Sequence, residues 1–493
     1  MCVSSTKLAA YKITSSLPRH GSSKQINKIL TATELQLEAL SELSFDTTPL
    51  NNLNNPVKIG NPNSGSIYAN SYVDLQKITT IGFDYDYTLL QYDDDNLLPL
   101  IYEMALAKLT DGNGAYPLAM KSTLKFDKSF AVRGLAVDLK TGWICQLSHS
   151  HKVAVAYYGT EPVSTEDMLL EFEGRRAMTP KQRQNRLKPL NDLFSMAECC
   201  LVAHVIEFFK DTDIDFHAKS VVEDVMAAIR DTHIKGEFHS LIVKSPSKYF
   251  KKSPQLKTIL SNILASNKKL MLLSNSPFWY VDKGMNYIIG ENWKQFFDVS
   301  IVLAGKPSFY TEKFRPFREV DSESGKTLFR KITTIEKNKV YTAGCLRELI
   351  RLLPDVLQGL PTADGDFCEL GSMPENDGDG EDNAACTYAP NVLYIGDSIF
   401  ADLVDAKREF GWTTAGVIAE LQEEVTINSN DDAICVKESI EILLHALRKI
   451  QSSAGLGTKV YTAEDKDILD KLELMVSEAR TAAADLRGFT PKT

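Results

Sequence analysis

The chain lacks the features of several protein classes. No apolar run is long enough to cross a lipid bilayer, which argues against a membrane protein. The eight cysteines form no C-x-x-C pair, so neither a disulfide framework nor a zinc site is indicated, and a reducing compartment fits. The net charge of −10 comes from acids and bases mixed throughout the 493 residues, which argues against a nucleic acid as the main partner.

Two segments each lack charge of one sign. Residues 1–33 contain no acid, and their basic residues are interleaved with serines, as in an organellar transit peptide or an ordinary disordered tail. We therefore expect a cytoplasmic protein, with a mitochondrial one as the alternative. Asp364–Asp382 holds eight acids and no base. This composition predicts a disordered loop over 364–387, because the alternative, a metal-binding tract, would need ordered ligand spacing.

The rest of the chain alternates between strand-like and helical segments, which predicts a doubly wound α/β fold with a Rossmann-like parallel sheet. The first part of this core, with an N-terminal helix, spans 34–111, and the second spans 253–425. Residues 112–252 interrupt the alternation with an antiparallel β unit over 130–158 and two amphipathic helices. We expect this inserted α+β segment to be a cap domain. Residues 426–493 predict a helical extension whose apolar stripe would dock on this chain or on a second copy. Docking on a second copy would make a homo-oligomer.

The chain is organised around a short apolar strand that ends in two acids. Ile78–Phe83 reads as a buried strand, and Asp84 and Asp86 follow it, with Thr88 two residues further on. An unpaired charge in low dielectric is very costly, so carboxylates at a buried strand need a reason to be there. The carboxyl end of a central parallel strand, where open α/β sheets bind ligands, provides one. A surface turn that contains Asp-Tyr-Asp is the competing interpretation.

Three further predicted strands end in groups that suit phosphoryl transfer. Ser274 and Asn275 follow one strand, Lys306 lies just beyond the next, and Asp397, with Asp402 one turn on, ends the last. In a parallel sheet all these tips would point into one crevice. Individually, Ser274 could cap a helix, Lys306 could be a solvated loop lysine, and Asp402 could be a first-turn helix acid.

Together these groups fit the hydrolysis of a phosphate monoester, which resists anionic attack until a cation screens its charge. Asp84 and Asp397 offer carboxylate oxygens to Mg²⁺, and Asp84 can attack phosphorus to give an aspartyl-phosphate. Asp86 can protonate the leaving alkoxide and then deprotonate the attacking water. Ser274 offers a hydroxyl and Lys306 a positive charge to the phosphoryl oxygens.

The motifs D-x-D-x-T at Asp84, Lys306 with Pro307, and G-D-x-x-x-x-D ending at Asp402 resemble those of the haloacid dehalogenase superfamily. More narrowly, they resemble the cytosolic purine 5'-nucleotidases and their 5'-nucleotidase domain-containing relatives. The resemblance implies a capped Rossmann-like core and Mg²⁺-dependent dephosphorylation of nucleoside 5'-monophosphates. It also implies three metal ligands, Asp84, Asp86 and Asp397, a supporting role for Asp402, and substrate contacts from Thr88, Asn275 and Ser276.

The cap segment departs from the purine pattern. Phe194, Ser195 and His233 match residues that contact the base in the purine nucleotidase, although Phe194 could equally belong to the core. The Arg and Asp contact positions of the family fall on Met226 and Arg230, and a later Lys position falls on His239. We therefore keep three hypotheses: a 5'-nucleotidase, a phosphatase for another small ester, and a non-catalytic scaffold that keeps the fold.

Overall fold

The computed structural model describes residues 67–69, 73–111, 115–148, 150–174, 178–234, 236–353 and 391–422, with three isolated positions beyond. Almost all of them belong to one compact unit, Ser71–Val417. The predicted tail 1–33 and acidic loop 364–387 lie outside the described residues, as does nearly all of the extension 426–493. Within the described part of the chain, no helix is both long and apolar enough to span a membrane.

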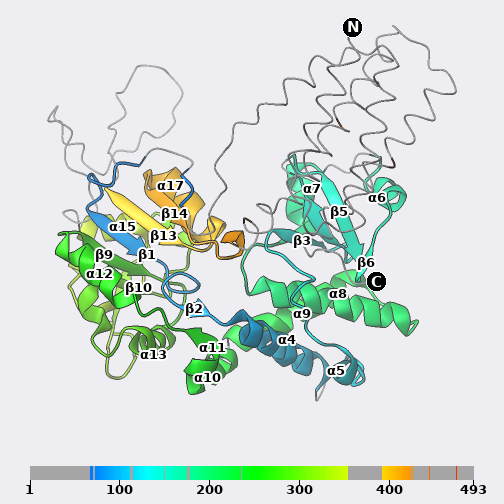
Figure 1. Ribbon diagram of the computed structural model, residues 1–493, viewed down its shortest axis with the longest axis horizontal. Helices are drawn as coiled ribbons and strands as arrows, with labels where there is room; N and C mark the ends of the chain where they lie inside the picture. Colours follow the sequence, from blue (N-terminus) through cyan, green and yellow to red (C-terminus); the bar gives the residue numbers. More distant parts are fainter. Residues whose placement is uncertain are drawn as a thin grey trace, which may run out of the picture. The chain divides into compact units, whose positions relative to one another are not determined.

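A seven-stranded sheet forms the centre of the core (Figure 1). Its pairs are parallel except the edge pair β11–β12, which is antiparallel. In spatial order its strands are β11 (Phe317–Val320), β12 (Val340–Ala343), β10 (Val299–Val302), β9 (Lys269–Leu273), β1 (Thr80–Phe83), β13 (Val392–Gly396) and β14 (Thr413–Gly416). The mostly parallel α/β sheet is therefore confirmed, while β11 and β12 were not among the predicted strands.

Both faces of this sheet are buried, as parallel sheets require. Along β9, Met271 and Leu273 pack into one hydrophobic cluster, whereas Leu270 and Leu272 pack into another, because successive side chains point to opposite faces. Helices between the strands contribute to these clusters. They are α12 (Leu256–Ala265), α13 (Phe278–Ile288), α14 (Ser308–Thr311), α15 (Leu346–Leu352) and α17 (Asp405–Phe410), with a short 3-10 turn at Trp293–Phe296.

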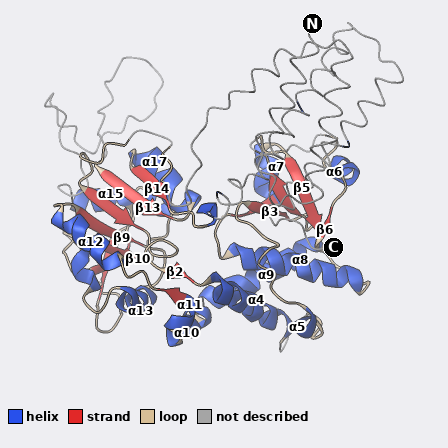
Figure 2. Cartoon of the chain, viewed as in Figure 1, coloured by secondary structure: helices blue, strands red, loops and turns tan. Residues whose placement is uncertain are grey.

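A separate antiparallel sheet forms between β1 and β9 in the chain (Figure 2). In spatial order it contains β6 (Glu161–Pro162), β5 (Val153–Tyr158), β4 (Ile144–Leu147), β3 (Leu135–Asp138) and β7 (Leu187–Leu190). The predicted antiparallel unit over 130–158 is thus confirmed, and two edge strands extend it. One of these, β7, tolerates Pro189 because an edge strand can do without one backbone donor.

Helices pack on one another beside the second sheet. The two predicted amphipathic helices are α8 (Ser195–Asp211) and α9 (Ala218–Ile234), and both pack against α4 (Asp94–Thr110). The shorter helices are α5 (Met120–Thr123), α6 (Thr165–Glu171), α7 (Pro180–Arg186), α10 (Glu237–Lys244) and α11 (Pro246–Tyr249). The predicted boundaries at 112 and 252 stay a prediction, because α4 precedes the first of them and yet packs on α8 and α9.

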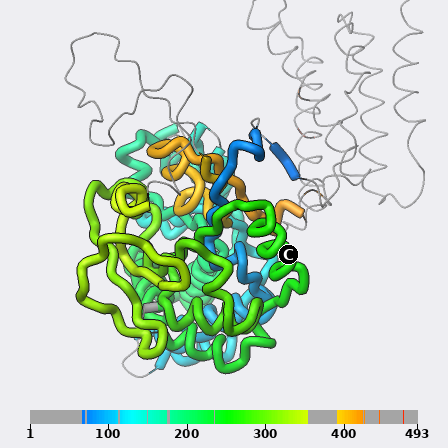
Figure 3. Tube along the Cα trace, turned by 90° about the vertical axis from the view of Figure 1, so that its left-hand side faces the viewer, coloured from blue at the N-terminus to red at the C-terminus, as the bar shows by residue number. Residues whose placement is uncertain are grey.

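The segment in which the chain leaves the core runs beside the segment in which it returns. β2 (Gln91–Tyr92) lies on the outgoing path and β8 (Phe250–Lys251) on the returning one, and the two pair antiparallel. The backbone N–H of Asp93 also donates to the carbonyl of Tyr249 at 2.8 Å. Both paths can be followed by colour in Figure 3. This short ladder therefore fixes the two crossings to each other.

Candidate active site

Asp84 and Asp86 follow β1 on a tight loop that the neighbouring strand anchors. The N–H of Asp84 donates to the carbonyl of Ile395 in β13 at 2.8 Å. The carbonyl of Tyr85 then accepts from Leu89 and Leu90, so the loop turns back directly after the strand. Asp84 is only 6% exposed, which a surface turn would not produce.

The ammonium group of Lys306 joins three strand ends. It donates to Asp84 Oδ1 at 2.7 Å and Asp402 Oδ1 at 2.6 Å, and it also contacts the Leu273 carbonyl and the Tyr394 hydroxyl. The Lys306 side chain is 2% exposed, so it is not a solvated loop lysine. Burial alone would lower the pKa of Lys306, but the carboxylates of Asp402 and Asp84 raise it above its ordinary value.

Asp397 follows β13, and an arginine just before the second sheet bonds to it. Arg133 lies in the loop before β3, and its Nη1 donates to the Asp397 carbonyl at 2.8 Å and to Asp397 Oδ2 at 3.4 Å. Burial raises the pKa of Asp397 to about 7, with Asp402 adding to the shift and Arg133 opposing it. Arg133 therefore introduces a second cation at the site.

Asp402 is a buried neighbour of Lys306. It lies on a π-helical turn, Ile399–Val404, and is 1% exposed. Its Oδ1 accepts from Lys306, and its Oδ2 accepts from the N–H of Ser398 at 3.1 Å. A Cβ on Gly396 would lie 2.5 Å from the carboxyl carbon of Asp402, so only glycine fits there.

Three buried carboxylates come together at this point. One oxygen from each of Asp84, Asp397 and Asp402 lies within 4.8 Å of the others. Burial raises the pKa of Asp84 well above its usual range, with Lys306 opposing the shift. Such a group of oxygen ligands suits a hard divalent cation, which would offset their mutual repulsion. Because both oxygens of Asp402 already accept hydrogen bonds, Asp84 and Asp397 are the better placed ligands.

Asp86, the third predicted metal ligand, is not part of this cluster of described side chains. Its Oδ1 accepts from the hydroxyl of Tyr92, and its Oδ2 accepts from the hydroxyl of Ser276 at 2.6 Å. Burial raises the pKa of Asp86, while the hydrogen bonds from Ser276 and Tyr92 oppose the shift. A carboxylate held between two hydroxyl donors suits proton transfer.

The residues after β9 form hydrogen bonds with one another and with Lys306 and Asp86. Ser274 is fully buried, and its Oγ accepts from the N–H of Ser276 at 3.0 Å. It does not cap α13, which begins at Phe278. The amide of Asn275 binds both backbone groups of Lys306, accepting from its N–H at 2.7 Å and donating to its carbonyl at 3.0 Å. Asn275 and Ser276, predicted to contact substrate, thus position Lys306 and Asp86.

Thr88 offers a hydroxyl with no other assignment. Among the described residues its buried Oγ1 has no hydrogen-bond partner. Buried hydroxyls nearly always have one, so this atom is available to a ligand. Thr88 lies on the loop 84–90, and its contact with substrate stays a prediction.

Two of the three predicted base-contacting residues lie in one aromatic cluster. The ring of Phe194 meets those of Tyr87, Tyr92 and His233 edge-on, at centroid distances of 5.1, 5.8 and 5.8 Å. Burial lowers the pKa of His233. By contrast, the N–H and hydroxyl of Ser195 both bond Asp192, so Ser195 serves the start of α8.

Sequence reasoning missed two residues of the site. Arg133 lies 264 positions before Asp397 in a loop with no motif around it. Tyr92 lies six positions after Asp86, and no motif marked it as a site residue. A polar atom on an otherwise buried aromatic was the one available signal for Tyr92.

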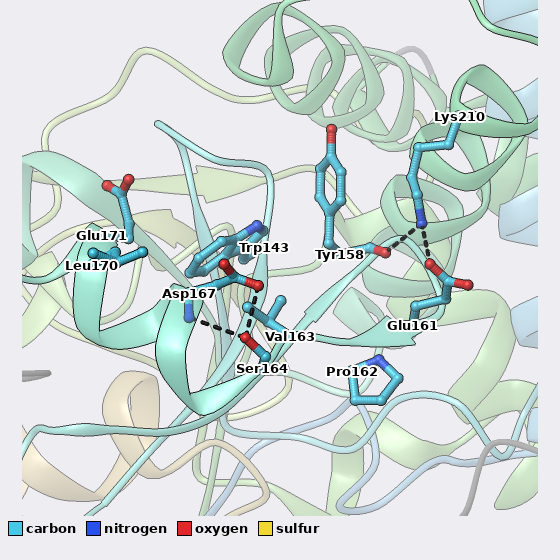
Figure 4. A pocket seen from close by; sticks show the side chains of 10 residues that line it. All are labelled: Trp143, Tyr158, Glu161, Pro162, Val163, Ser164, Asp167, Leu170, Glu171 and Lys210. Atoms are coloured by element: carbon cyan, nitrogen blue, oxygen red, sulfur yellow. Dashed lines mark hydrogen bonds and ion pairs between the residues drawn. The ribbon is translucent and has the colours of Figure 1, made fainter.

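A cavity of about 590 Å³ lies elsewhere, beside the second sheet (Figure 4). It is lined by Trp143, Tyr158, Glu161, Pro162, Val163, Ser164, Asp167, Leu170, Glu171 and Lys210, and none of these is a predicted site residue. Lys210 pairs with Glu161 at 2.8 Å, and Ser164 with Asp167 at 2.7 Å, so its polar groups satisfy one another.

Known proteins share most of this chain. A model of the 5' nucleotidase family matches residues 67–355 and 382–490. 5'-nucleotidase domain-containing protein 2 of Homo sapiens is 31% identical over 424 residues, which cover 84% of this chain and 73% of that protein. Its counterpart in Rattus norvegicus is also 31% identical, with 84% and 68% covered. A 5'-nucleotidase domain-containing protein of Dictyostelium discoideum is 30% identical, with 84% and 65% covered.

The match extends over both sheets and includes every candidate residue, from Asp84 to Asp402. The chain belongs to the 5' nucleotidase family.

Proposed function

We propose that the protein hydrolyses nucleoside 5'-monophosphates in a Mg²⁺-dependent reaction that passes through an aspartyl-phosphate on Asp84. The observation that carries this proposal is the convergence of Asp84, Lys306, Asp397 and Asp402 beyond the ends of β1, β10 and β13. A structural role alone does not account for so many ionisable groups in a buried crevice. Family membership supports the reaction class.

The residues divide the work by their geometry. The carboxylate of Asp84 attacks phosphorus, and the bond from phosphorus to the nucleoside oxygen breaks. Lys306, fixed by Asn275, balances charge on Asp84 and on the phosphoryl oxygens. When bound by Asp84 and Asp397, Mg²⁺ would screen the phosphate charge and orient it for attack. Thr88 and Ser274 offer hydroxyl groups to the phosphoryl oxygens.

Asp86 moves the protons. In the first half of the reaction it protonates the departing nucleoside oxygen. In the second half it takes a proton from water, which attacks phosphorus and releases phosphate and free Asp84. Asp86 is thereby protonated again for the next cycle. The hydrogen bond from Ser276 to its Oδ2 helps to direct its carboxyl group.

A different small phosphate ester is the second candidate substrate, and His239 is the observation in its favour. His239 occupies the position of a family lysine, and burial lowers its pKa to about 4, so it is neutral near pH 7. Its ring packs against Tyr280 at 4.5 Å. A contact that is a cation in the purine pattern is therefore uncharged here.

Assays of the purified full chain against nucleoside monophosphates and sugar phosphates test both candidates. We expect turnover with Mg²⁺, loss with EDTA, and loss in Asp84→Asn. Asp95→Asn is the matched control, because Asp95 is exposed and pairs only with Lys128 among the described salt bridges. A sugar phosphate as the best substrate would replace the first candidate by the second. No turnover of any ester would contradict both and favour a scaffold.

A further inference from the structure

We propose that Tyr92, backed by Tyr280, is the positioning residue for Asp86, and that its hydroxyl holds this carboxyl group through both proton transfers. The inference rests on the proposed function and adds a residue to it. Tyr92 is 3% exposed and lies on β2, just after the loop 84–90 that carries Asp84 and Asp86.

The contacts of Asp86 are the first argument. Of its two oxygens, Oδ2 accepts from Ser276, and Oδ1 accepts from Tyr92. A carboxyl group on a loop has two rotatable bonds, so it can rotate away from its position when either hydrogen-bond donor is removed. Tyr92 therefore controls the oxygen that Ser276 does not.

The partner of Tyr92 is the second argument. Its hydroxyl lies 2.8 Å from that of Tyr280, and either oxygen can be the donor. A hydroxyl both donates and accepts, so the chain from Asp86 through Tyr92 to Tyr280 can reverse direction. When Asp86 is a carboxylate, Tyr92 donates to it and accepts from Tyr280. When Asp86 carries its proton, Tyr92 can accept that hydrogen bond and donate to Tyr280. The geometry of Asp86 can thus stay the same in both halves of the cycle.

The rigidity of Tyr92 is the third argument. Its ring is packed between Tyr87 at 4.8 Å and Phe250 at 5.7 Å, while β2 pairs with β8. Tyr280, 1% exposed, is fixed on α13, and its backbone carbonyl accepts from Tyr85. Neither phenol can move far from Asp86.

Tyr92→Phe tests the inference, because it removes the hydroxyl and keeps the ring. Tyr102→Phe is the matched control: Tyr102 is fully buried on α4, and its hydroxyl bonds His204 of α8 at 2.8 Å. Both variants are assayed as full chains with Mg²⁺ on a nucleoside monophosphate and on p-nitrophenyl phosphate. Since p-nitrophenolate leaves without a proton, only the second step of its hydrolysis needs Asp86.

We expect kcat for Tyr92→Phe to fall about tenfold on both esters, since one hydrogen bond to the acid–base group is lost. On p-nitrophenyl phosphate KM should fall with kcat, because the first step, which sets kcat/KM, does not need the proton of Asp86. On p-nitrophenyl phosphate the first turnover should stay fast and the second step should slow. A burst of about one p-nitrophenolate per enzyme should therefore precede the steady state. Tyr102→Phe should behave as the intact protein, and Tyr280→Phe should lose about threefold in kcat.

A purely structural role gives a different result. It would lower the amount of active enzyme, so the burst would shrink in proportion to kcat, and that outcome overturns the inference. Unchanged kcat in Tyr92→Phe, with an active parent protein, overturns it while leaving the proposed function intact. An inactive parent protein overturns both. If Tyr92→Phe does not fold, the same burst and kcat measurements on Tyr280→Phe decide the question.

Discussion

Replacing Lys306 by methionine should be among the most damaging single changes in this protein. The lysine side chain is 2% exposed and donates to Asp84 at 2.7 Å and Asp402 at 2.6 Å. Its removal leaves two buried carboxylates facing each other without a cation. Breaking a buried ion pair on one side costs about 3–5 kcal/mol of unfolding free energy. We also expect kcat to fall by about 10²–10³, because the charge opposite the transferred phosphoryl group is gone.

A surface pair of the same length provides the control. Lys121 donates to Asp111 at 2.7 Å, as Lys306 does to Asp84, but both of its side chains are about half exposed. Water already solvates these charges, so Lys121→Met should cost less than about 1 kcal/mol. Chemical denaturation followed by tryptophan fluorescence measures both changes, with Trp293 and Trp412 buried in the core as probes.

The pH dependence of the loss tests its cause. Burial raises the pKa of Asp84, and removing Lys306 takes away the main opposing effect, so the pKa rises further. The folded variant then binds a proton that the unfolded chain, with an aspartate pKa of about 3.9, releases. Its stability therefore increases as the pH falls toward 5, by up to about 1.4 kcal/mol per pH unit. Equal losses in Lys306→Met and Lys121→Met, or a loss independent of pH, would refute this reasoning.

Three further changes are expected to have measurable effects. Asp84→Asn should abolish turnover and remove labelling of the protein by ³²P-phosphate ester in acid-quenched samples; persistent labelling would point to another nucleophile. Gly396→Ala should destabilise the fold by about 1–3 kcal/mol in thermal unfolding, because the new methyl group would overlap the Asp402 carboxylate. The pKa of His239, lowered to about 4 by burial and by His233, makes stability complete above about pH 6.5 and reduces it as the pH falls through 4. Denaturation at several pH values should show a loss of at most about 3 kcal/mol over this range that His239→Phe removes, and an unchanged slope in that variant would contradict the assignment.

Strand-end chemistry made the centre of the site predictable. Each predicted strand was short, apolar and followed by a polar group, and parallel pairing brings such ends to one edge. The register shows this directly, because Phe83 pairs with both Leu272 and Ile395. Asp84, Ser274 and Asp397 therefore follow strands that end almost level.

The contacts of the second sheet were not predictable in the same way. Arg133 has no periodic neighbour or motif, and only the path of a folded loop brings it to Asp397. The edge strand β11 and its antiparallel neighbour β12 were also missed, because polar residues interrupt both: Arg318 and Glu319 in Phe317–Val320, and Thr342 in Val340–Ala343.

The roles of Asn275 and Ser276 show a related limit. A motif gives a residue its place in the chain but not its partner in space. Both lie where a substrate contact was expected, and their side chains instead bond Lys306 and Asp86. Knowing which side chain a polar group faces required the fold.

The double hydrogen bond between Asn275 and the backbone of Lys306 has a consequence for the two loops that it joins. The carboxamide of Asn275 accepts one backbone hydrogen bond and donates another, as a neighbouring strand would. It therefore ties the loop after β9 to the loop after β10. An aspartate at position 275 would lack the N–H donor, and the side chain of a glutamine would be one methylene too long. The spacing between these two loops is therefore fixed by one carboxamide.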